Sequence, residues 1–186
     1  GNIAEDTRIT STLKTINFLK DAEAKIIIIS HLGRPKGKVV EKLRLTKVAE
    51  KLSELLKLEV KKAPDAIGEE TQAILENMQE GEIVMLENIR FHKEEKENDS
   101  SFSKTIASYG DLYVNDAFGA AHRAHSSTVG ITEHLPAYSG LLMEKEIEAL
   151  TPLIADEPKR PLTMIFGGAK IDTKIGVIKN FLDKAD

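Results

Sequence analysis

The feature that most constrains the fold is the unbroken apolar run of residues 26–29, four isoleucines in succession. A strand with one face in water alternates apolar and polar residues, whereas a strand buried in a parallel sheet is apolar on both faces. Residues 82–86 and 162–166 form comparable runs, and weaker ones fall at 58–61 and 111–114. These runs predict strands of a parallel sheet that is covered on both sides.

Helical patterns separate the predicted strands. Apolar residues recur at helical spacing in 7–22, 69–78 and 102–109, after Thr46, at Met143, Ile147, Leu150 and Ile154, and at Ile175, Ile178 and Leu182. Asp6 and Thr46 are the expected N-caps, and Pro152 should kink its helix or remove a hydrogen bond. The alternation predicts an α/β fold, a doubly wound, Rossmann-like parallel sheet with helices on both faces.

The composition argues against several classes of site and partner. The chain has no cysteine, which excludes disulfides, zinc–thiolate sites, iron–sulfur clusters and thiol catalysis. A net charge of −4, with three tyrosines and no tryptophan, argues against nucleic acid as a partner. No apolar run approaches the length of a membrane span, so we expect a cytoplasmic protein that uses no membrane. We interpret the mixed-charge run 92–99 as a solvated loop.

The arginines are the first sign of a ligand. Four of the six, namely Arg8, Arg34, Arg90 and Arg123, lie at a helix start or in a loop just after a predicted strand. The carboxyl ends of parallel strands share one edge, where such folds bind ligands, and a guanidinium fork suits carboxylate and phosphate. A small polyanion with at least one phosphate is one interpretation. The other is four unrelated surface arginines paired with acids, and the pattern alone favours neither.

Histidines and a glycine turn add weaker signals. His31, His122 and His125 fall near the same edge and could donate to phosphate, although a loop histidine is more often only a surface side chain. A metal on His122, His125 and Asp116 is conceivable, but nothing fixes their geometry, so we expect no metal site. The segment 167–170, Gly-Gly-Ala-Lys, could cradle a phosphate with Lys170 and Lys174 above it. On its own this segment is weak evidence, and a plain strand-to-helix turn is its more common explanation.

Five segments together resemble the phosphoglycerate kinase family, in order and at fitting spacings. They are Asp6-Thr-Arg-Ile9, Ser30-His-Leu-Gly-Arg-Pro35, Leu86-Glu-Asn-Ile-Arg-Phe91, Asn115-Asp-Ala-Phe-Gly-Ala-Ala-His-Arg-Ala-His125 and Gly167-Gly-Ala-Lys170. The resemblance covers essentially the whole chain. It implies two doubly wound domains, one for 3-phosphoglycerate and one for Mg-ATP or Mg-ADP. It also implies reversible phosphoryl transfer between 1,3-bisphosphoglycerate and ADP, in glycolysis.

The resemblance also assigns roles to residues of this chain. It implies phosphoglycerate binding by Arg8, His31, Leu32, Gly33, Arg34, Arg90, His122, Arg123 and His125. Arg8 and Lys170 would stabilise the phosphoryl group in transfer. Gly167, Gly168, Lys170 and Lys174 would contact the nucleotide phosphates, with Mg²⁺ carried by the nucleotide and no metal held by the chain itself.

The chain departs from the family pattern at both ends. It opens without a Met on a helical pattern and stops directly after another, so we expect a piece of a longer protein, itself a monomer. Residues 1–140 would be the phosphoglycerate-binding domain without its first strand, 141–157 the interdomain helix, and 158–186 the first βα unit of the nucleotide domain. We therefore expect no kinase activity from the chain alone. The alternatives are a stand-alone anion-binding module and a nucleic-acid or protein interaction domain.

Overall fold

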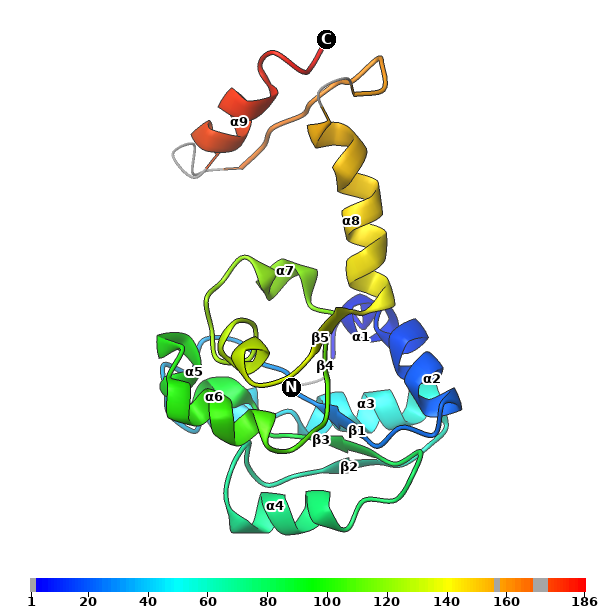
Figure 1. The fold of residues 1–186 in the computed structure, drawn as a ribbon, viewed down its shortest axis with the longest axis vertical. Coiled ribbons are helices and arrows are strands. Elements are labelled where there is room, and N and C mark those ends of the chain that lie inside the picture. Colours follow the sequence, from blue (N-terminus) through cyan, green and yellow to red (C-terminus); the bar gives the residue numbers. More distant parts are fainter. Residues whose placement is uncertain (1–2, 156–157, 169–173) are drawn as a thin grey trace. The chain divides into compact units, whose positions relative to one another are not determined.

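The structure is a computed structural model that describes residues 3–155, 158–168 and 174–186 (Figure 1). The chain divides into two compact units, Gly1–Met143 and Glu144–Asp186, called here the first and the second unit. None of the helices in the described residues is long and apolar enough to cross a membrane.

The strands of the first unit are all paired in parallel. Strand β3 (Ile83–Met85) lies between β1 (Ile26–Ile28) and β2 (Val60–Lys62), and β4 (Tyr113–Asn115) pairs with β5 (Ala137–Ser139). The predicted parallel α/β class is thus confirmed. The strands form a three-stranded and a two-stranded sheet rather than one continuous sheet, and β5 has no counterpart in the sequence prediction.

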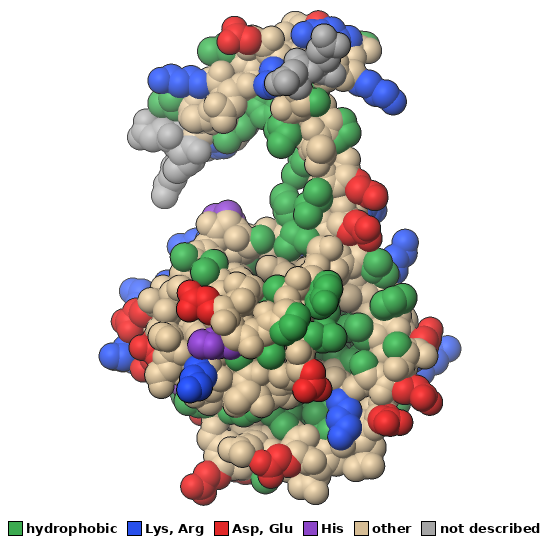
Figure 2. All heavy atoms as spheres, viewed as in Figure 1, with side chains coloured by type: hydrophobic (Ala, Val, Ile, Leu, Met, Phe, Trp, Pro, Cys, Tyr) green, Lys and Arg blue, Asp and Glu red, His purple; other side chains and the backbone are tan. Residues whose placement is uncertain are grey.

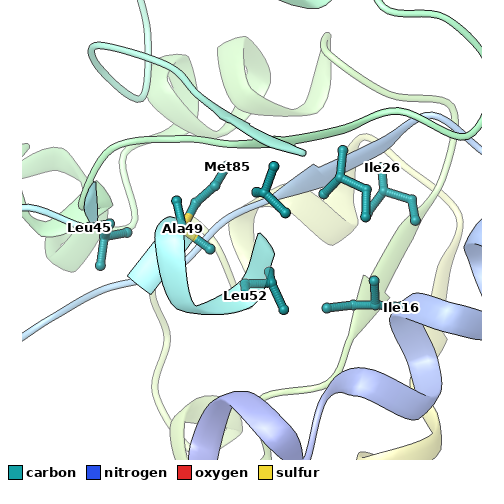
Figure 3. Close-up of a cluster of buried hydrophobic side chains, with 8 residues drawn as sticks. Ile16, Ile26, Leu45, Ala49, Leu52 and Met85 are labelled. Carbon is teal, nitrogen blue, oxygen red and sulfur yellow. The ribbon is translucent and has the colours of Figure 1, made fainter. Parts of the chain in front are cut away.

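The isoleucine run sends its side chains alternately to both faces of the three-stranded sheet. Ile26 and Ile28 pack with helices α2 (Leu13–Asp21) and α3 (Thr46–Leu56) in one core cluster (Figure 3). Ile27 and Ile29 belong to a second cluster with the buried β3 residue Val84 and with Leu75 of helix α4 (Glu69–Glu76). Helices therefore cover both faces, as the pattern predicts for buried parallel strands.

The predicted helix over 7–22 is interrupted. It forms as α1 (Thr7–Thr10) and α2, with a turn at Ser11 and Thr12 between them. The Ser11 hydroxyl donates to the carbonyl of Thr7 at 2.7 Å and the Thr12 hydroxyl to that of Ile9 at 2.9 Å. Such side chains compete with the backbone ladder, a cost that apolar periodicity does not register. Asp6 occupies the predicted N-cap position of α1, although its side chain makes no cap bond. The predicted cap at Thr46 is wrong, because Thr46 is the first helical residue of α3 and Leu45 precedes it as the cap.

The remaining elements of the first unit are short and irregular. They are helices α5 (Glu94–Glu97), α6 (Ser100–Ala107) and α7 (Phe118–Ala121), and 3₁₀ turns at Glu41–Leu43, Ile89–Phe91 and Gly130–Glu133. Helix α6 packs Phe102 and Ile106 against Ile89 and Ile131 in a third core cluster. This cluster supports the loops that follow β3 and β4.

The second unit departs most from the prediction. Helix α8 (Leu141–Ile154), which begins in the first unit, contains Pro152 in its last turn, and α9 spans Ile175–Phe181. The predicted strand 162–166 is wrong: these residues pair with no strand among the described residues, and Ile165 is 92 % exposed. A strand needs a neighbour for its backbone groups. Figure 2 shows hydrophobic side chains along α8, where Ile147, Leu150 and Ile154 are exposed.

Candidate anion-binding site

Arg90 is the most unusual side chain of the first unit. It lies in the 3₁₀ turn Ile89–Phe91, shortly after β3, and is only 7 % exposed. Its Nη1 donates to the carbonyl oxygen of Gly33 at 3.3 Å, while its buried Nε has no hydrogen-bond partner among the described residues. A buried cation without a counter-charge is costly. The unused donor therefore leaves Arg90 available to an anion.

The six arginines fall into two groups. Arg44 forms ion pairs with Glu41 at 2.7 Å and Glu87 at 3.0 Å, and Arg160 pairs with Asp186. In the part of the chain that the structure describes, no carboxylate lies within 4.0 Å of the other four, which are Arg8, Arg34, Arg90 and Arg123. These four are the ones that the sequence placed at the sheet edge. Their lack of acidic partners favours a polyanion over the surface-pair interpretation.

His31 shows that these charges lie near one another. The pKa of His31 is lowered to about 4. Partial burial of the ring is the largest cause, and the charges of Arg90 and Arg123 follow, with smaller contributions from His125 and Arg8. His31 as a whole is nevertheless exposed to solvent. We call Arg8, His31, Arg34, Arg90, His122, Arg123 and His125 the basic rim.

Each member of the basic rim can be placed relative to another. The charge of Arg34 acts on Arg90, and burial together with the charges of Arg90 and Arg123 lowers the pKa of His125. His122 is exposed, and its Nε2 accepts from Nε of Arg123 at 3.3 Å. The structure thus brings together the charged side chains expected to bind phosphoglycerate. The described residues contain no group of three or more His, Asp or Glu that could hold a metal ion.

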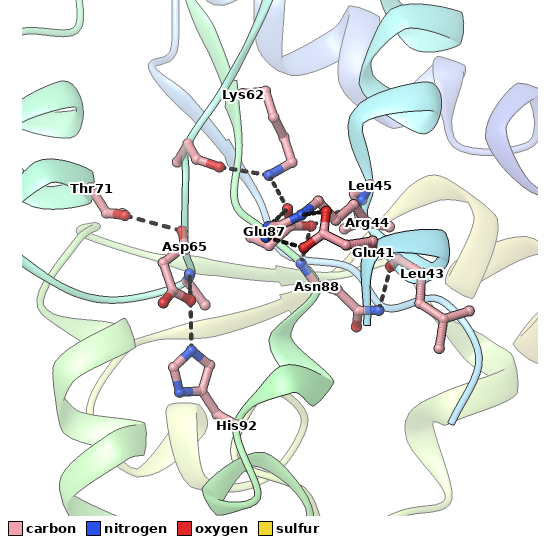
Figure 4. Close-up of polar contacts among 12 residues, drawn as sticks. Glu41, Leu43, Arg44, Leu45, Lys62, Asp65, Thr71, Glu87, Asn88 and His92 are labelled. Atoms are coloured by element: carbon pink, nitrogen blue, oxygen red, sulfur yellow. Dashed lines mark hydrogen bonds and ion pairs between the residues drawn. The ribbon is translucent and has the colours of Figure 1, made fainter. Parts of the chain in front are cut away.

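Asn88 holds the loop that carries His31 and Arg34. Its side chain is fully buried, and its Nδ2 donates to the carbonyls of Leu32 at 2.9 Å and Leu43 at 2.8 Å (Figure 4). Its Oδ1 accepts from the backbone N–H of Arg90 at 3.2 Å. One amide therefore joins three segments around the basic rim. The sequence analysis quoted Asn88 in a motif but assigned it no role.

Gly33 is required for the close approach of this loop to the chain that follows it. Its φ is +65°, and a Cβ at this position would come within 2.8 Å of Cδ2 of Leu43. The neighbouring Leu32 is 39 % exposed. Leu32 and Gly33 were both predicted to contact substrate. In the structure their carbonyl oxygens accept hydrogen bonds, that of Leu32 from Asn88 and that of Gly33 from Arg90.

Glu87 anchors the same region from the other side. Its carboxylate accepts from the backbone N–H groups of Leu45 at 2.9 Å and Asn88 at 2.8 Å, and pairs with Arg44 and Lys62 (Figure 4). Burial acts to raise its pKa, but the two backbone hydrogen bonds and the two cations outweigh burial and lower the pKa of Glu87. We call Glu41, Arg44, Lys62 and Glu87 the Glu87 cluster. All its charges are compensated, unlike those of the rim.

Glu95 is a second buried carboxylate that the sequence analysis missed. The run 92–99 was interpreted as a solvated loop, which is wrong for this residue: Glu95 lies in α5 and is 2 % exposed. Its Oε2 accepts from the Ser127 backbone N–H at 3.0 Å and its Oε1 from the Ser127 hydroxyl at 2.7 Å. No apolar period marks α5, so nothing in the sequence distinguishes Glu95 from the exposed Glu97 of the same turn.

The second unit holds the residues expected to contact nucleotide. Gly168 has φ of +108°, and the Nζ of Lys174 lies 2.6 Å from the position that a Cβ there would occupy. Lys174 thus lies next to Gly168, whereas a Cβ at Gly167 would meet no atom within 4 Å. Lys170 lies outside the described residues. Helix α9 begins at Ile175, so Gly167 and Gly168 are not part of its first turn.

The whole chain is similar in sequence and structure to known proteins. Residues 1–186 match the family described as phosphoglycerate kinase. The phosphoglycerate kinase of Synechococcus elongatus is 54% identical over 187 residues, which cover 100% of this chain and 46% of that protein. Among solved structures, phosphoglycerate kinase from Coxiella burnetii is 37% identical with a TM-score of 0.85, over 100% of this chain and 46% of that one. The phosphoglycerate kinase from Pyrococcus horikoshii OT3 is 35% identical with a TM-score of 0.90, over 100% and 47%.

These similarities agree with the five motifs that the sequence presents in order. They extend over both units and include the loops of the basic rim. The chain spans about half the length of the curated relatives that it matches. It belongs to the phosphoglycerate kinase family.

Proposed function

We propose that the protein to which this chain belongs transfers a phosphoryl group reversibly between 1,3-bisphosphoglycerate and ADP, giving 3-phosphoglycerate and ATP. The first unit would bind 3-phosphoglycerate in the basic rim. The observation that carries this proposal is Arg90, a buried guanidinium with an unused Nε and no acidic partner in the described chain. Arg8, Arg34 and Arg123, equally without acidic partners there, supply the further charge that a phosphate and a carboxylate need.

The proposed reaction requires little covalent chemistry from the protein. The attacking carboxylate of 3-phosphoglycerate is already ionised, so no general base is required. Phosphoryl transfer then depends on positioning and on neutralising the charge of the phosphoryl group. Guanidinium forks of the rim would orient the phosphate and carboxylate, and Arg8 would face the group in transfer. His31, neutral in the absence of ligand, would gain a proton as a phosphate comes to lie beside it.

The nucleotide side of the reaction is only partly present in this chain. Gly167, Gly168, Lys170 and Lys174 would contact the phosphates of Mg-ATP or Mg-ADP, and Lys170 would stabilise the transferring group from that side. The placement of Lys174 next to Gly168 is compatible with a phosphate contact. Mg²⁺ on the nucleotide supplies charge neutralisation when it is bound. Because this site is incomplete, the 186-residue chain should show no turnover.

The proposal extends to organisation and location. Residues 1–140 would form the phosphoglycerate-binding domain, 141–157 the interdomain helix and 158–186 the start of the nucleotide domain. The whole protein would act as a monomer in the cytoplasm, on small molecules rather than on nucleic acid or membranes. The net charge of −4 agrees with partners that bind a local basic site and not a broadly basic surface.

Calorimetric titration of the chain with 3-phosphoglycerate tests the proposal, with sulfate at matched ionic strength as the competing anion. We expect saturable binding that is tighter than that of sulfate. Arg90→Ala should weaken it by about ten- to a hundredfold, because charge-assisted hydrogen bonds are worth about 1.5–3 kcal/mol. Lys104→Ala removes one positive charge from an exposed position of α6 and should change little.

Two results would count against the proposal. Binding of 3-phosphoglycerate no tighter than that of sulfate would leave the rim a general anion site. An equal loss in Arg90→Ala and Lys104→Ala would show that bulk charge, and not the rim, determines affinity. Turnover of 1,3-bisphosphoglycerate and ADP by the purified chain would separately contradict its expected inactivity.

A further inference from the structure

Helix α5 and the loop carrying Arg123 and His125 are joined at several points. Besides the two bonds from Ser127 to the Glu95 carboxylate, the backbone N–H of Ser126 donates to the carbonyl of Glu95 at 2.8 Å. The Ser126 hydroxyl donates to the carbonyl of Glu94 at 3.0 Å. The loop after α7 is therefore tied to α5, and Glu95 is the only charged side chain among these contacts.

Glu95 also faces the cations of the basic rim. Its Oε1 lies 3.3 Å from Nδ1 of His125, which is itself 9 % exposed. The charges of Glu95 and Arg90 act on each other. Glu95 is nevertheless too far from Arg90 to form an ion pair with it in the described structure. It offsets part of the charge of Arg90 without occupying its Nε.

The contact between Glu95 and His125 selects one form of the imidazole. Burial and the charges of Arg90 and Arg123 lower the pKa of His125, so the ring is neutral near neutral pH. A neutral ring carries its proton on either Nδ1 or Nε2. A carboxylate oxygen 3.3 Å from Nδ1 repels a lone pair there and attracts a proton. The Glu95 carboxylate therefore favours the tautomer with the proton on Nδ1, and Nε2 has no hydrogen-bond partner among the described residues.

We propose that Glu95 is a positioning residue of the anion site, which fixes the loop at Ser127 and sets the tautomer of His125. The unprotonated Nε2 can then take up a proton from a bound phosphate, and the Glu95 carboxylate at Nδ1 stabilises the imidazolium that forms, which an amide at this position cannot do. This inference rests on the proposed binding of 3-phosphoglycerate. Loss of the Glu95 charge makes the rim more positive, which alone would strengthen anion binding. A positioning role requires the opposite result, and this difference in sign makes the proposal testable.

Glu95→Gln is the informative variant because an amide has one acceptor and one donor end. The Ser127 backbone N–H can only donate, so the amide oxygen should take the position of Oε2. The amide NH₂ then falls at Oε1, beside Nδ1 of His125, to which it donates. The Ser127 hydroxyl can rotate to accept. We therefore expect His125 to change from the Nδ1–H to the Nε2–H tautomer.

The first experiment observes the tautomer without any ligand. Long-range ¹H–¹⁵N spectra of the histidine rings are recorded for the ¹⁵N-labelled chain, with His125 assigned through the His125→Gln variant. Nδ1–H in the wild type and Nε2–H in Glu95→Gln is the expected result. The same tautomer in both would overturn the proposal, whether or not 3-phosphoglycerate binds.

The second experiment measures 3-phosphoglycerate affinity in Glu95→Gln, with Glu97→Gln as the matched control. Both variants remove one negative charge from α5, but Glu97 is exposed. We expect about tenfold weaker binding in Glu95→Gln and unchanged or slightly tighter binding in Glu97→Gln. Ser127→Ala, which keeps the carboxylate and the backbone donor, should lose less. Circular dichroism confirms that each variant is folded at the titration temperature.

The outcomes separate the inference from the proposed function. If the wild type binds 3-phosphoglycerate and the two glutamine variants bind it equally well or more tightly, Glu95 acts only through its charge and the inference is wrong. If the wild type does not bind it, the proposed function fails for this chain, and the ring spectra still decide whether Glu95 sets the tautomer.

Discussion

The Glu87 cluster and the basic rim lie in the same unit, and both are built from charged side chains in loops next to the ends of parallel strands. In the Glu87 cluster, Arg44 and Lys62 share a carboxylate that also accepts two backbone hydrogen bonds. In the rim, Arg90 is buried like Glu87 but has an unused Nε. Pairing, and not burial or residue type, separates a cluster that holds the fold from one that is ready for an anion. Substitutions should therefore affect stability in the first and affinity in the second.

The largest effect should follow from Glu87→Ala. The change leaves Arg44, Lys62 and two backbone N–H groups without their shared acceptor, which for a broken buried ion pair costs about 3–5 kcal/mol of unfolding free energy. Urea denaturation measures this loss. Glu50→Ala, which removes an exposed pair with Lys47 at 3.0 Å, should cost less than about 1 kcal/mol. Similar losses in both variants would remove the distinction drawn for the Glu87 cluster.

Asn88→Ala should affect both properties, because Asn88 borders both regions. It leaves the carbonyls of Leu32 and Leu43 without their buried donor, at a cost of about 1–3 kcal/mol. It also frees the loop of His31 and Arg34, so 3-phosphoglycerate affinity should fall as well. Asn77→Ala, at an exposed helix end, serves as the control. Lower stability with unchanged affinity would show that the loop keeps its place without Asn88.

Arg90→Leu gives the sharpest contrast in sign. It removes a buried cation that forms no ion pair in the described structure, so the unfolding free energy should stay the same or rise by about 1 kcal/mol while binding is lost. The corresponding change in the other region, Arg44→Leu, should lower the unfolding free energy because it uncovers the buried Glu87. The denaturant midpoints of the two variants measure these opposite changes in stability. If Arg90→Leu destabilised the chain as much as Arg44→Leu, the prediction that only the Glu87 cluster stabilises the fold would be contradicted.

The smallest effect concerns the proton of His31. In the free chain its pKa is about 4, and a bound phosphate should raise that pKa by offsetting Arg90 and Arg123. Binding near pH 6 should therefore take up a fraction of a proton more in the wild type than in His31→Gln. Calorimetry in two buffers of different ionisation enthalpy measures this difference, since the ligand's own titration is common to both proteins. Equal uptake would place the phosphate away from His31.

The sequence predicted the basic rim better than several other parts of the chain, for physical reasons. The rim arginines could be found because strand order and the shared edge of a parallel sheet bring loop residues together. Glu95 could not, because its burial depends on Ser127, 32 residues away, and no local period records such a contact. The break at Ser11 and Thr12 came from side-chain hydroxyls, which apolar periodicity ignores. Residues 162–166 have strand composition, but composition does not supply a neighbouring strand.

The division of the first unit's strands into two sheets has a colloidal consequence. β1 and β2 bound one sheet and β4 and β5 the other, so each of these strands has a single strand neighbour in the described chain. β5 is exposed along its whole length. Unpaired strand edges present backbone donors and acceptors to other chains. Concentrated samples should therefore self-associate, with light scattering that rises with protein concentration and a melting temperature that depends on it. The stability of the protein in storage then depends on whether these strand edges are covered.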